Sequence, residues 1–237
     1  MTAGAPVDGS ALLALLSRPA PEAAPHLLGA LLGHRGEDGA VVVRITEIEA
    51  YGGPAGSDLP DPGAHTWGGR TARNASMFGP PGHVYVYFTY GMHHAVNLVC
   101  RPEGTAGGCL VRAGEVVEGV ELARARRARG RTSPVPDAGL ARGPGNLAKA
   151  LGIDLSHDGA GLAAGDPAAP GFFLVPPGAG TPAPVASGPR TGVSGPGGTA
   201  EFPWRWWIPG EPSVSPYRAA APRRRHRPPG PAAAQDG

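Results

Sequence analysis

The sequence predicts a single α+β domain with antiparallel strands. Runs rich in β-branched and aromatic residues at 40–51, 83–90 and 95–100 are typical of strands. A Gly-Met pair at 91–92 joins the last two runs by a tight turn, which makes them antiparallel neighbours. With 237 residues, the chain is long enough to bury one substantial core.

The composition narrows the class of protein. The 39 glycines and 29 prolines together reach a fraction of the chain that is found in low-complexity proteins. In contrast, 41% hydrophobic residues and a net charge of +2 are typical of a folded protein. No apolar run approaches the roughly 18 residues of a membrane helix, and no basic start resembles a secretory signal. Cys100 and Cys109 form no disulfide scaffold or zinc motif, so we expect a cytoplasmic protein. Lys149 is the only lysine among many arginines, which indicates a prokaryote with a GC-rich genome.

The other elements follow from local patterns. A leucine-rich run predicts one helix, and an Arg-bearing run and a run after Gly-Pro-Gly predict two more, at 23–32, 116–129 and 147–151. Further strands are predicted at 108–113, 172–175 and 204–208. A Gly/Pro/Asp loop follows the first strand at 52–63, and no regular structure is expected from Pro209 onward.

Two carboxylates occur in the strand at 40–51. Side chains alternate faces along a strand, so Glu47, Glu49 and Tyr51 share the face of Val43 and Ile45 if no bulge intervenes. Carboxylates that continue an apolar row can lie at the mouth of a pocket, where partial desolvation favours a general base. The alternative is a strand end that emerges into water. The strand alone leaves both interpretations open.

The aromatic strand at 83–90 also has two interpretations. Tyr85 and Tyr87 lie on one face and Phe88 and Tyr90 on the other. Aromatic residues on both faces are typical of core, but they also suit a platform on which a planar ligand stacks. The adjacent residues at 93–94 are both histidine and point to opposite faces, which is poor geometry for a metal. We therefore expect no metal and no cofactor.

Many short segments together resemble the alkyladenine (3-methyladenine, methylpurine) DNA glycosylase family. They occur in the family's order over about 20–217, at 45–51, 61–65, 69–74, 77–82, 85–92, 97, 110–113, 143–147, 190–193, 204–206 and 214–215. The resemblance implies a curved antiparallel sheet with flanking helices and a protruding β-hairpin that inserts into DNA. It also implies a domain at 20–217, between a loosely ordered segment at 1–19 and a basic, Pro/Ala/Arg-rich disordered tail at 218–237.

The resemblance also implies a role for individual residues. Glu49 would activate a water for attack on the sugar C1′ of a flipped nucleotide, and Arg112 would help to hold that water. The flipped purine would be enclosed by Tyr51, His65 and Tyr87 and would meet Asn97 at the pocket floor, where guanine is rejected. Tyr90 at the hairpin tip would enter the minor groove, with Met92 beside it on the DNA.

The implied activity is monofunctional excision of alkylated or deaminated purines from duplex DNA, which leaves an abasic site. Flipping costs a few kcal/mol, and base–aromatic stacking returns roughly 1–3 kcal/mol. Glycosylases that also cut the strand use an amine, and Lys149 lies outside the pocket motifs. A monomer without a membrane partner, acting on DNA in the nucleoid, is the simplest expectation.

An alternative function is a catalytically silent nucleic-acid-binding module on the same fold. Retention of Glu49 together with Arg112 favours the enzyme, because a pure binder has no need of a water-activating carboxylate. The loop from Tyr51 to His65 is a few residues longer than is usual in the family. The tail arginines at 223–227 are expected to make a modest, salt-sensitive contribution to nonspecific DNA affinity.

Overall fold

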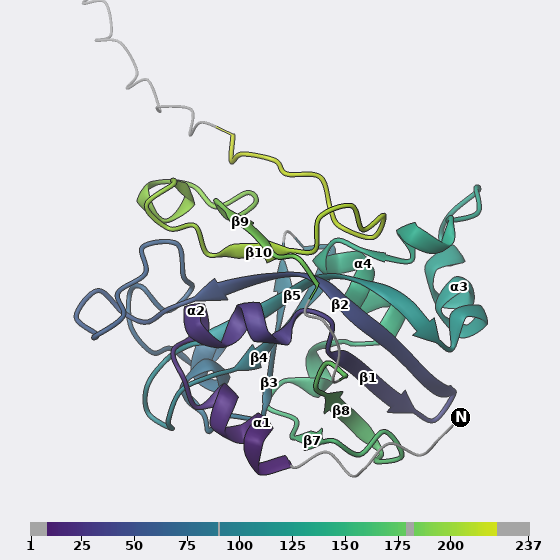
Figure 1. The fold of residues 1–237 in the computed structure, drawn as a ribbon, viewed down its shortest axis with the longest axis horizontal. Coiled ribbons are helices and arrows are strands. Elements are labelled where there is room, and N and C mark those ends of the chain that lie inside the picture. Colours follow the sequence, from purple (N-terminus) through teal and green to yellow (C-terminus); the bar gives the residue numbers. More distant parts are fainter. Residues whose placement is uncertain (1–8, 90, 179–182, 222–237) are drawn as a thin grey trace, which may run out of the picture.

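One curled, mostly antiparallel sheet organises the chain. The computed structural model describes residues 9–89, 91–178 and 183–221. Within them the main path of the sheet has the order β3-β4-β5-β2-β1-β8-β7, and only the β7–β8 pair is parallel (Figure 1). The strands are β1 (Leu31–Gly36), β2 (Gly39–Tyr51), β3 (Val84–Thr89), β4 (His93–Val99), β5 (Gly108–Glu118), β6 (Ala141–Arg142), β7 (Leu162–Ala164), β8 (Gly171–Val175), β9 (Ala186–Gly188) and β10 (Arg205–Trp207).

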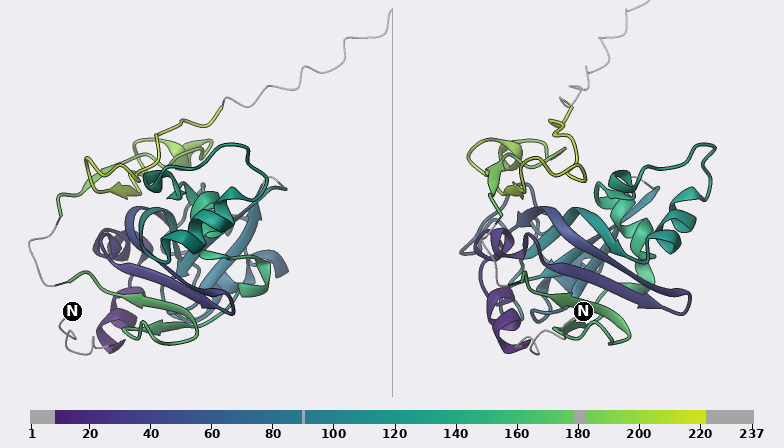
Figure 2. Two further views of the ribbon diagram at one scale, coloured as in Figure 1. Left: turned by 90° about the vertical axis from the view of Figure 1, so that its right-hand side faces the viewer. Right: turned by 45° about the vertical axis from the view of Figure 1, so that its right-hand side comes forward.

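Helices flank this sheet on two sides. The α-helices are α1 (Gly9–Leu16), α2 (Ala20–Ala23), α3 (Val120–Ala128) and α4 (Pro144–Leu151). Helices α3 and α4 lie together at one side of the sheet, away from α1 and α2, and the segment that carries β9 and β10 covers another edge (Figure 2). The predicted α+β class with an antiparallel curved sheet is confirmed. Within the described residues, no helix has the length and apolar character needed to cross a membrane.

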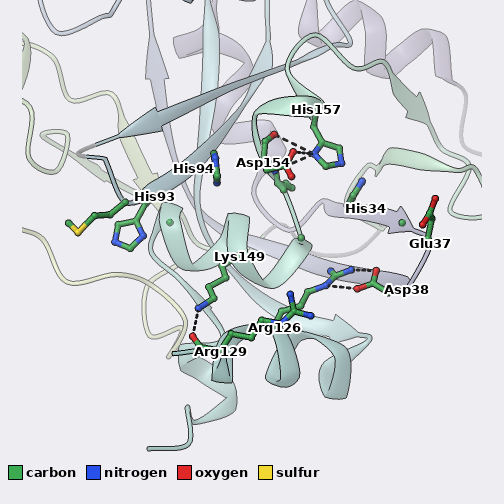
Figure 3. A pocket seen from close by; sticks show the side chains of 15 residues that line it. His34, Glu37, Asp38, His93, His94, Arg126, Arg129, Lys149, Asp154 and His157 are labelled. Atoms are coloured by element: carbon green, nitrogen blue, oxygen red, sulfur yellow. Dashed lines mark hydrogen bonds and ion pairs between the residues drawn. The ribbon is translucent and has the colours of Figure 1, made fainter. Parts of the chain in front are cut away.

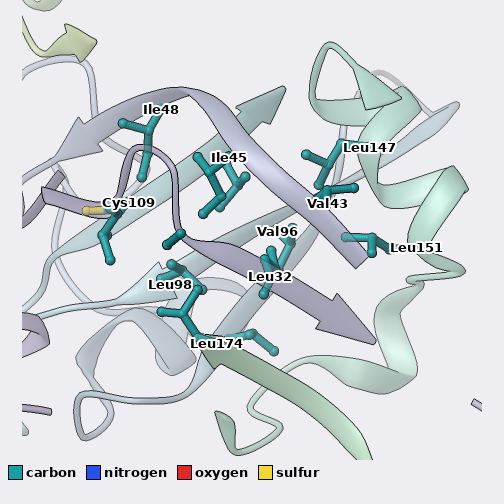
Figure 4. Packing of buried hydrophobic residues seen from close by; sticks show 14 of the residues in the cluster. Leu32, Val43, Ile45, Ile48, Val96, Leu98, Cys109, Leu147, Leu151 and Leu174 are labelled. Atoms are coloured by element: carbon teal, nitrogen blue, oxygen red, sulfur yellow. The ribbon is translucent and has the colours of Figure 1, made fainter. Parts of the chain in front are cut away.

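The main core lies between β1, β2, β4, β8 and helix α4. Leucine, isoleucine and valine side chains from these elements meet in one buried cluster, which includes Leu32, Val43, Ile45, Val96 and Leu147 (Figure 4). Buried apolar surface contributes roughly 25 cal/mol per Å², so this cluster is a major source of the domain's stability. The sheet face opposite this cluster is left for polar and aromatic side chains.

A local irregularity in β2 and β5 changes which side chains face the core. The register shifts between Ile45 and Glu47 and again between Glu47 and Ile48, so that Glu47 pairs with Ala113. Val43 and Ile45 belong to the main core before the irregularity, and Ile48 belongs to it afterwards. The prediction that Glu49 shares a face with Val43 and Ile45 assumed that no bulge intervenes, and this assumption was wrong. Bulges re-aim side chains, and this one turns Glu49 to the face opposite the core.

The predicted helix at 23–32 was wrong in its second half. The chain forms α2 and a 3-10 turn over Ala24–Leu27, and then Gly29 takes a φ of 82°, which ends helical structure. The following leucines form β1, where Leu32 pairs with Val43. A short leucine run is buried equally well by a helix and by a central strand, so its periodicity does not separate the two.

Two other boundaries differ from the expectation. Strand β5 continues to Glu118, and the helix expected from Val116 begins only at Val120, after Gly119 turns the chain with a φ of 71°. The expected short strands at the chain's later segments are found as β8 and β10.

The chain ends are more ordered than expected where the structure describes them. In the segment at 1–19, residues 9–16 form α1, which buries Leu12 and Leu16 in the main core. After Pro209 the chain has no regular element, but Ser213 and Ser215 are buried and hydrogen-bonded to strand β2. Residues 1–8 lie outside the described residues, and so do residues 222–237, which make up most of the predicted tail.

Candidate active site

A row of side chains crosses the sheet on the face opposite the core. The strand registers pair Tyr85 of β3 with Asn97 of β4, Asn97 with Leu110 of β5, and Leu110 with Glu49 of β2. Directly paired residues of antiparallel strands point to the same face. Four segments far apart in the sequence therefore form one continuous floor, and Glu49 lies at one end of it.

Glu49 is completely buried and accepts three hydrogen bonds. Its Oε1 accepts from the backbone N–H of Thr191 at 2.6 Å. Its Oε2 accepts from the Tyr51 hydroxyl at 2.9 Å and from Arg112 Nη1 at 3.2 Å. Burial and the nearby Glu49 carboxylate raise the pKa of Tyr51 well above its ordinary value, so this hydroxyl keeps its proton and donates it.

A second buried carboxylate, Glu47, holds the arginine of the site. Its Oε1 accepts from Arg112 Nε at 2.9 Å and from Arg205 Nε at 2.7 Å, and its Oε2 accepts from the Ser215 backbone N–H at 2.7 Å. Burial alone would raise the pKa of Glu47, but the charges of Arg112 and Arg205 and the hydrogen bond from Ser215 outweigh it and keep that pKa low. Arg112 is thereby fixed between two carboxylates.

A buried ion pair anchors the loop that follows β2. Arg190 Nη1 and Nη2 each lie 2.6 Å from an oxygen of Asp61, and both side chains are fully buried. Asp61 also accepts from the backbone N–H groups of Gly52 and Gly63. A Cβ at Gly63 would lie 2.5 Å from Arg190 Nη2, so glycine allows the close approach. The Arg190 guanidinium in turn lies 4.5 Å from the centre of the Tyr51 ring.

A cavity of about 570 Å³ opens above the floor. It is lined by Tyr51, His65, Tyr87, Asn97 and Arg112, which are five of the predicted site residues. His65 and Tyr87 meet edge to face at 4.6 Å. Burial, with a smaller effect of the Arg73 charge, lowers the pKa of His65, so that its ring is neutral near pH 7. The cavity reaches Glu49 through its three donors, which all line the wall.

The predicted site residues are thus brought together with two exceptions. Met92 is 69% exposed on the turn after β3 and lines a different cavity, and Tyr90 lies outside the described residues. The family resemblance gave no role to Glu47, Arg205 or the Asp61–Arg190 pair. Asp61 and Arg190 both occur in segments quoted for the family resemblance, which was the available signal for them.

The comparisons with known proteins decide the family. Residues 14–212 match the family model described as methylpurine-DNA glycosylase (MPG). The chain belongs to this family. A relative from Streptomyces avermitilis is 53% identical over 88% of this chain and 92% of its own length. Relatives from Leifsonia xyli and Nocardia farcinica are 53% and 52% identical, over 83% and 84% of this chain and 87% of their own length. All three are named "Putative 3-methyladenine DNA glycosylase".

Membership of the methylpurine-DNA glycosylase family confirms the predicted class of enzyme. The chain is a DNA glycosylase, a hydrolase that acts on N-glycosyl bonds, and DNA is its substrate. The relatives are bacterial, in agreement with the prokaryotic origin inferred from the arginine bias.

Proposed function

We propose that this glycosylase acts in base excision repair, by flipping alkylated or deaminated purines out of duplex DNA and hydrolysing their N-glycosidic bond. The observation that carries the proposal is the cavity between aromatic side chains whose wall leads directly to Glu49 and Arg112. A flipped purine needs a flat, apolar enclosure, and the bond cleavage needs a carboxylate next to it. The product is an abasic site, and the substrate is DNA of the bacterial nucleoid.

Glu49 is the general base in this proposal. A carboxylate has about four acceptor sites, and Glu49 uses three of them, so one site on Oε1 remains for the water that it activates. The Thr191 backbone N–H and the Arg112 guanidinium then keep the carboxylate in place. The Thr191 hydroxyl oxygen is buried and has no hydrogen-bond partner among the described residues, so it can serve as a further contact for the water.

Arg112 has two tasks beside Glu49. Burial alone would lower the pKa of Arg112. The charges of Glu49 and Glu47 outweigh burial and raise this pKa above its ordinary value, so the guanidinium stays charged throughout the reaction. It lines the cavity, where it can hold the attacking water, and it orients the carboxylate that takes the proton.

The aromatic wall selects the base in this proposal. An alkylated purine such as 3-methyladenine carries positive charge, and electron-rich rings such as those of Tyr51 and Tyr87 attract a cation. A protonated histidine would repel it, which makes the lowered pKa of His65 favourable. Asn97 Nδ2 donates to the Tyr85 carbonyl at 3.2 Å, which fixes the amide at the floor, where it would reject the exocyclic amine of guanine.

The hairpin of β3 and β4 provides the proposed DNA contact. Tyr90 would enter the minor groove and fill the gap left by the flipped base, with the exposed Met92 beside it. An apolar wedge of this kind offsets part of the cost of unstacking.

Excision assays on defined duplexes test the proposal. We expect release of the damaged base from duplexes that contain hypoxanthine, 1,N6-ethenoadenine or 3-methyladenine, and no release from the undamaged control. Heating in alkali converts the abasic product to a strand break, which a denaturing gel measures. Tight binding without excision of any of the three lesions would favour the silent binding module instead.

We also expect the enzyme to be monofunctional. Strand cutting by a glycosylase needs an amine that forms a Schiff base with the sugar. Lys149 donates from Nζ to the Arg129 carbonyl at 2.7 Å and does not line the base cavity. Sodium borohydride should therefore trap no covalent complex with a lesion duplex. Efficient trapping, with a known bifunctional glycosylase as the positive control, would contradict this.

A further inference from the structure

A second cavity lies beside the hairpin, on the other side from the base cavity. It has a volume of about 550 Å³ and is lined by the start of β4, by α3 and α4, and by the turn between β1 and β2 (Figure 3). Thr89 and Pro144 line the base cavity, whereas Met92 and Gly145 line the second one. The β3–β4 turn and the start of α4 therefore form a ridge with one cavity on each side.

Because of this arrangement, the second cavity faces the backbone of a bound duplex. The base cavity can receive a nucleotide only if the duplex lies over its mouth, and the turn that bears Met92 is then against the DNA. Double-stranded DNA carries one negative charge per roughly 1.7 Å of its axis. A duplex that continues across the ridge brings its phosphates to the second cavity.

Three acidic residues, Glu37, Asp38 and Asp154, and three basic residues, Arg126, Arg129 and Lys149, line the second cavity. At the end away from the hairpin, Asp38 pairs with Arg126 at 2.5 Å, and Asp154 Oδ1 lies 3.0 Å from His157 Nδ1. Lys149 projects from α4 on the side of His93, and its Nζ contacts the carbonyl of Arg129 at the end of α3 (Figure 3).

Neither of these two cations forms an ion pair within the described parts of the chain, 9–89, 91–178 and 183–221. Lys149 uses one of its three N–H donors for the Arg129 carbonyl, which holds the two residues together and leaves two donors for a ligand. Two cations without an ion-pair partner among the described residues therefore line the cavity, and Lys149 is the one on the side of His93.

We propose that this second cavity binds backbone phosphates of the substrate duplex, with Lys149 and Arg129 as the phosphate ligands. The inference rests on the proposed function only in placing DNA against the hairpin. The contact is independent of sequence and of the lesion, because phosphates carry no base information. It holds the duplex on the side of the wedge that faces away from the flipped nucleotide.

Salt dependence of DNA binding tests this site. The variants are Lys149→Gln and Arg129→Gln, and the matched control is Arg124→Gln, which removes an exposed α3 arginine that pairs with Asp137 and Glu121. Dissociation constants are measured for lesion-containing and undamaged duplexes over a range of NaCl concentrations. The Arg129 variant keeps its backbone carbonyl and hence the contact from Lys149, which separates loss of charge from loss of packing.

Each of the two variants is expected to lower the salt slope by about one ion, for both duplexes alike. The ratio of wild-type to variant affinity should then fall about threefold between ~50 and ~200 mM salt. Lys149→Arg should keep the wild-type slope, and Arg124→Gln should not change it. Unchanged slopes for both variants, or an equal change in the Arg124 control, would overturn the proposal.

Two additional results separate the proposal from neighbouring explanations. Inorganic phosphate that binds the wild type but not the Lys149→Gln variant, while the DNA slopes stay equal, would mean a site for a free anion and would refute the DNA contact. Absence of excision by the wild type would refute the proposed function, but the slopes on undamaged DNA would still test the phosphate contact. The two failures are thus distinguishable.

Discussion

Replacement of Glu49 by glutamine is expected to reduce the single-turnover excision rate by about 10²–10⁴-fold. Glutamine has the same shape but cannot take a proton from water. Its amide can keep the hydrogen bond from the Thr191 backbone N–H, whereas the other end of the amide meets the donors of Tyr51 and Arg112. The rate at saturating enzyme on a hypoxanthine or ethenoadenine duplex is the measurement.

The control for this prediction is the same change at an exposed carboxylate. Glu115 on β5 pairs with Arg44 at the surface, and neither residue lines the base cavity. Glu115→Gln is therefore expected to keep wild-type excision. Thermal unfolding and DNA affinity of both variants show whether a loss comes from folding or binding. An excision rate that is the same for Glu49→Gln and wild type would refute a water activated by Glu49.

The second large effect is expected for Asp61→Asn. This change removes the charge that compensates Arg190, and both side chains are 0% exposed. Breaking a buried ion pair from one side typically costs about 3–5 kcal/mol, because the remaining charge stays buried without a partner. We expect a loss of this order in the free energy of unfolding, measured by urea denaturation.

The same variant should also impair catalysis in the fraction that remains folded. Arg190 lies against the Tyr51 ring, and the next residue, Thr191, donates to Glu49. A matched control is Asp137→Asn, because Asp137 pairs with Arg124 while 67% and 42% of the two side chains are exposed. Its loss of stability should be much smaller, since solvent screens the pair. Equal losses for the two variants would contradict the assigned importance of burial.

Much of the sheet could be predicted because its residues are locally informative. The run at 40–51 contains enough valine, isoleucine and threonine to identify β2 to within one residue, and the turn at 91–92 identifies the β3–β4 pair. Leucines at the start of β1 were harder, since a buried strand and a buried helix have the same composition over a short run.

The candidate site was less predictable from the residues alone. The alternation in β2 placed Glu49 with Val43 and Ile45, and only the structure shows the irregularity near Glu47 that turns it away from the core. The buried partners of Arg112 lie 63 to 103 positions from it in the sequence, and no local pattern relates such segments. The family resemblance supplied the site residues, whereas their mutual support required the fold.

The row of paired residues across β3, β4, β5 and β2 has a consequence for variation in the chain. Neighbouring strands lie about 4.8 Å apart, so the separation of Asn97 from Glu49 is two strand spacings and is set by backbone hydrogen bonds. Loops that join these strands can gain or lose residues without changing that separation. A one-residue slip of β4 would instead turn Asn97 into the core. Lengths between strands are therefore free to vary, while lengths within them are not.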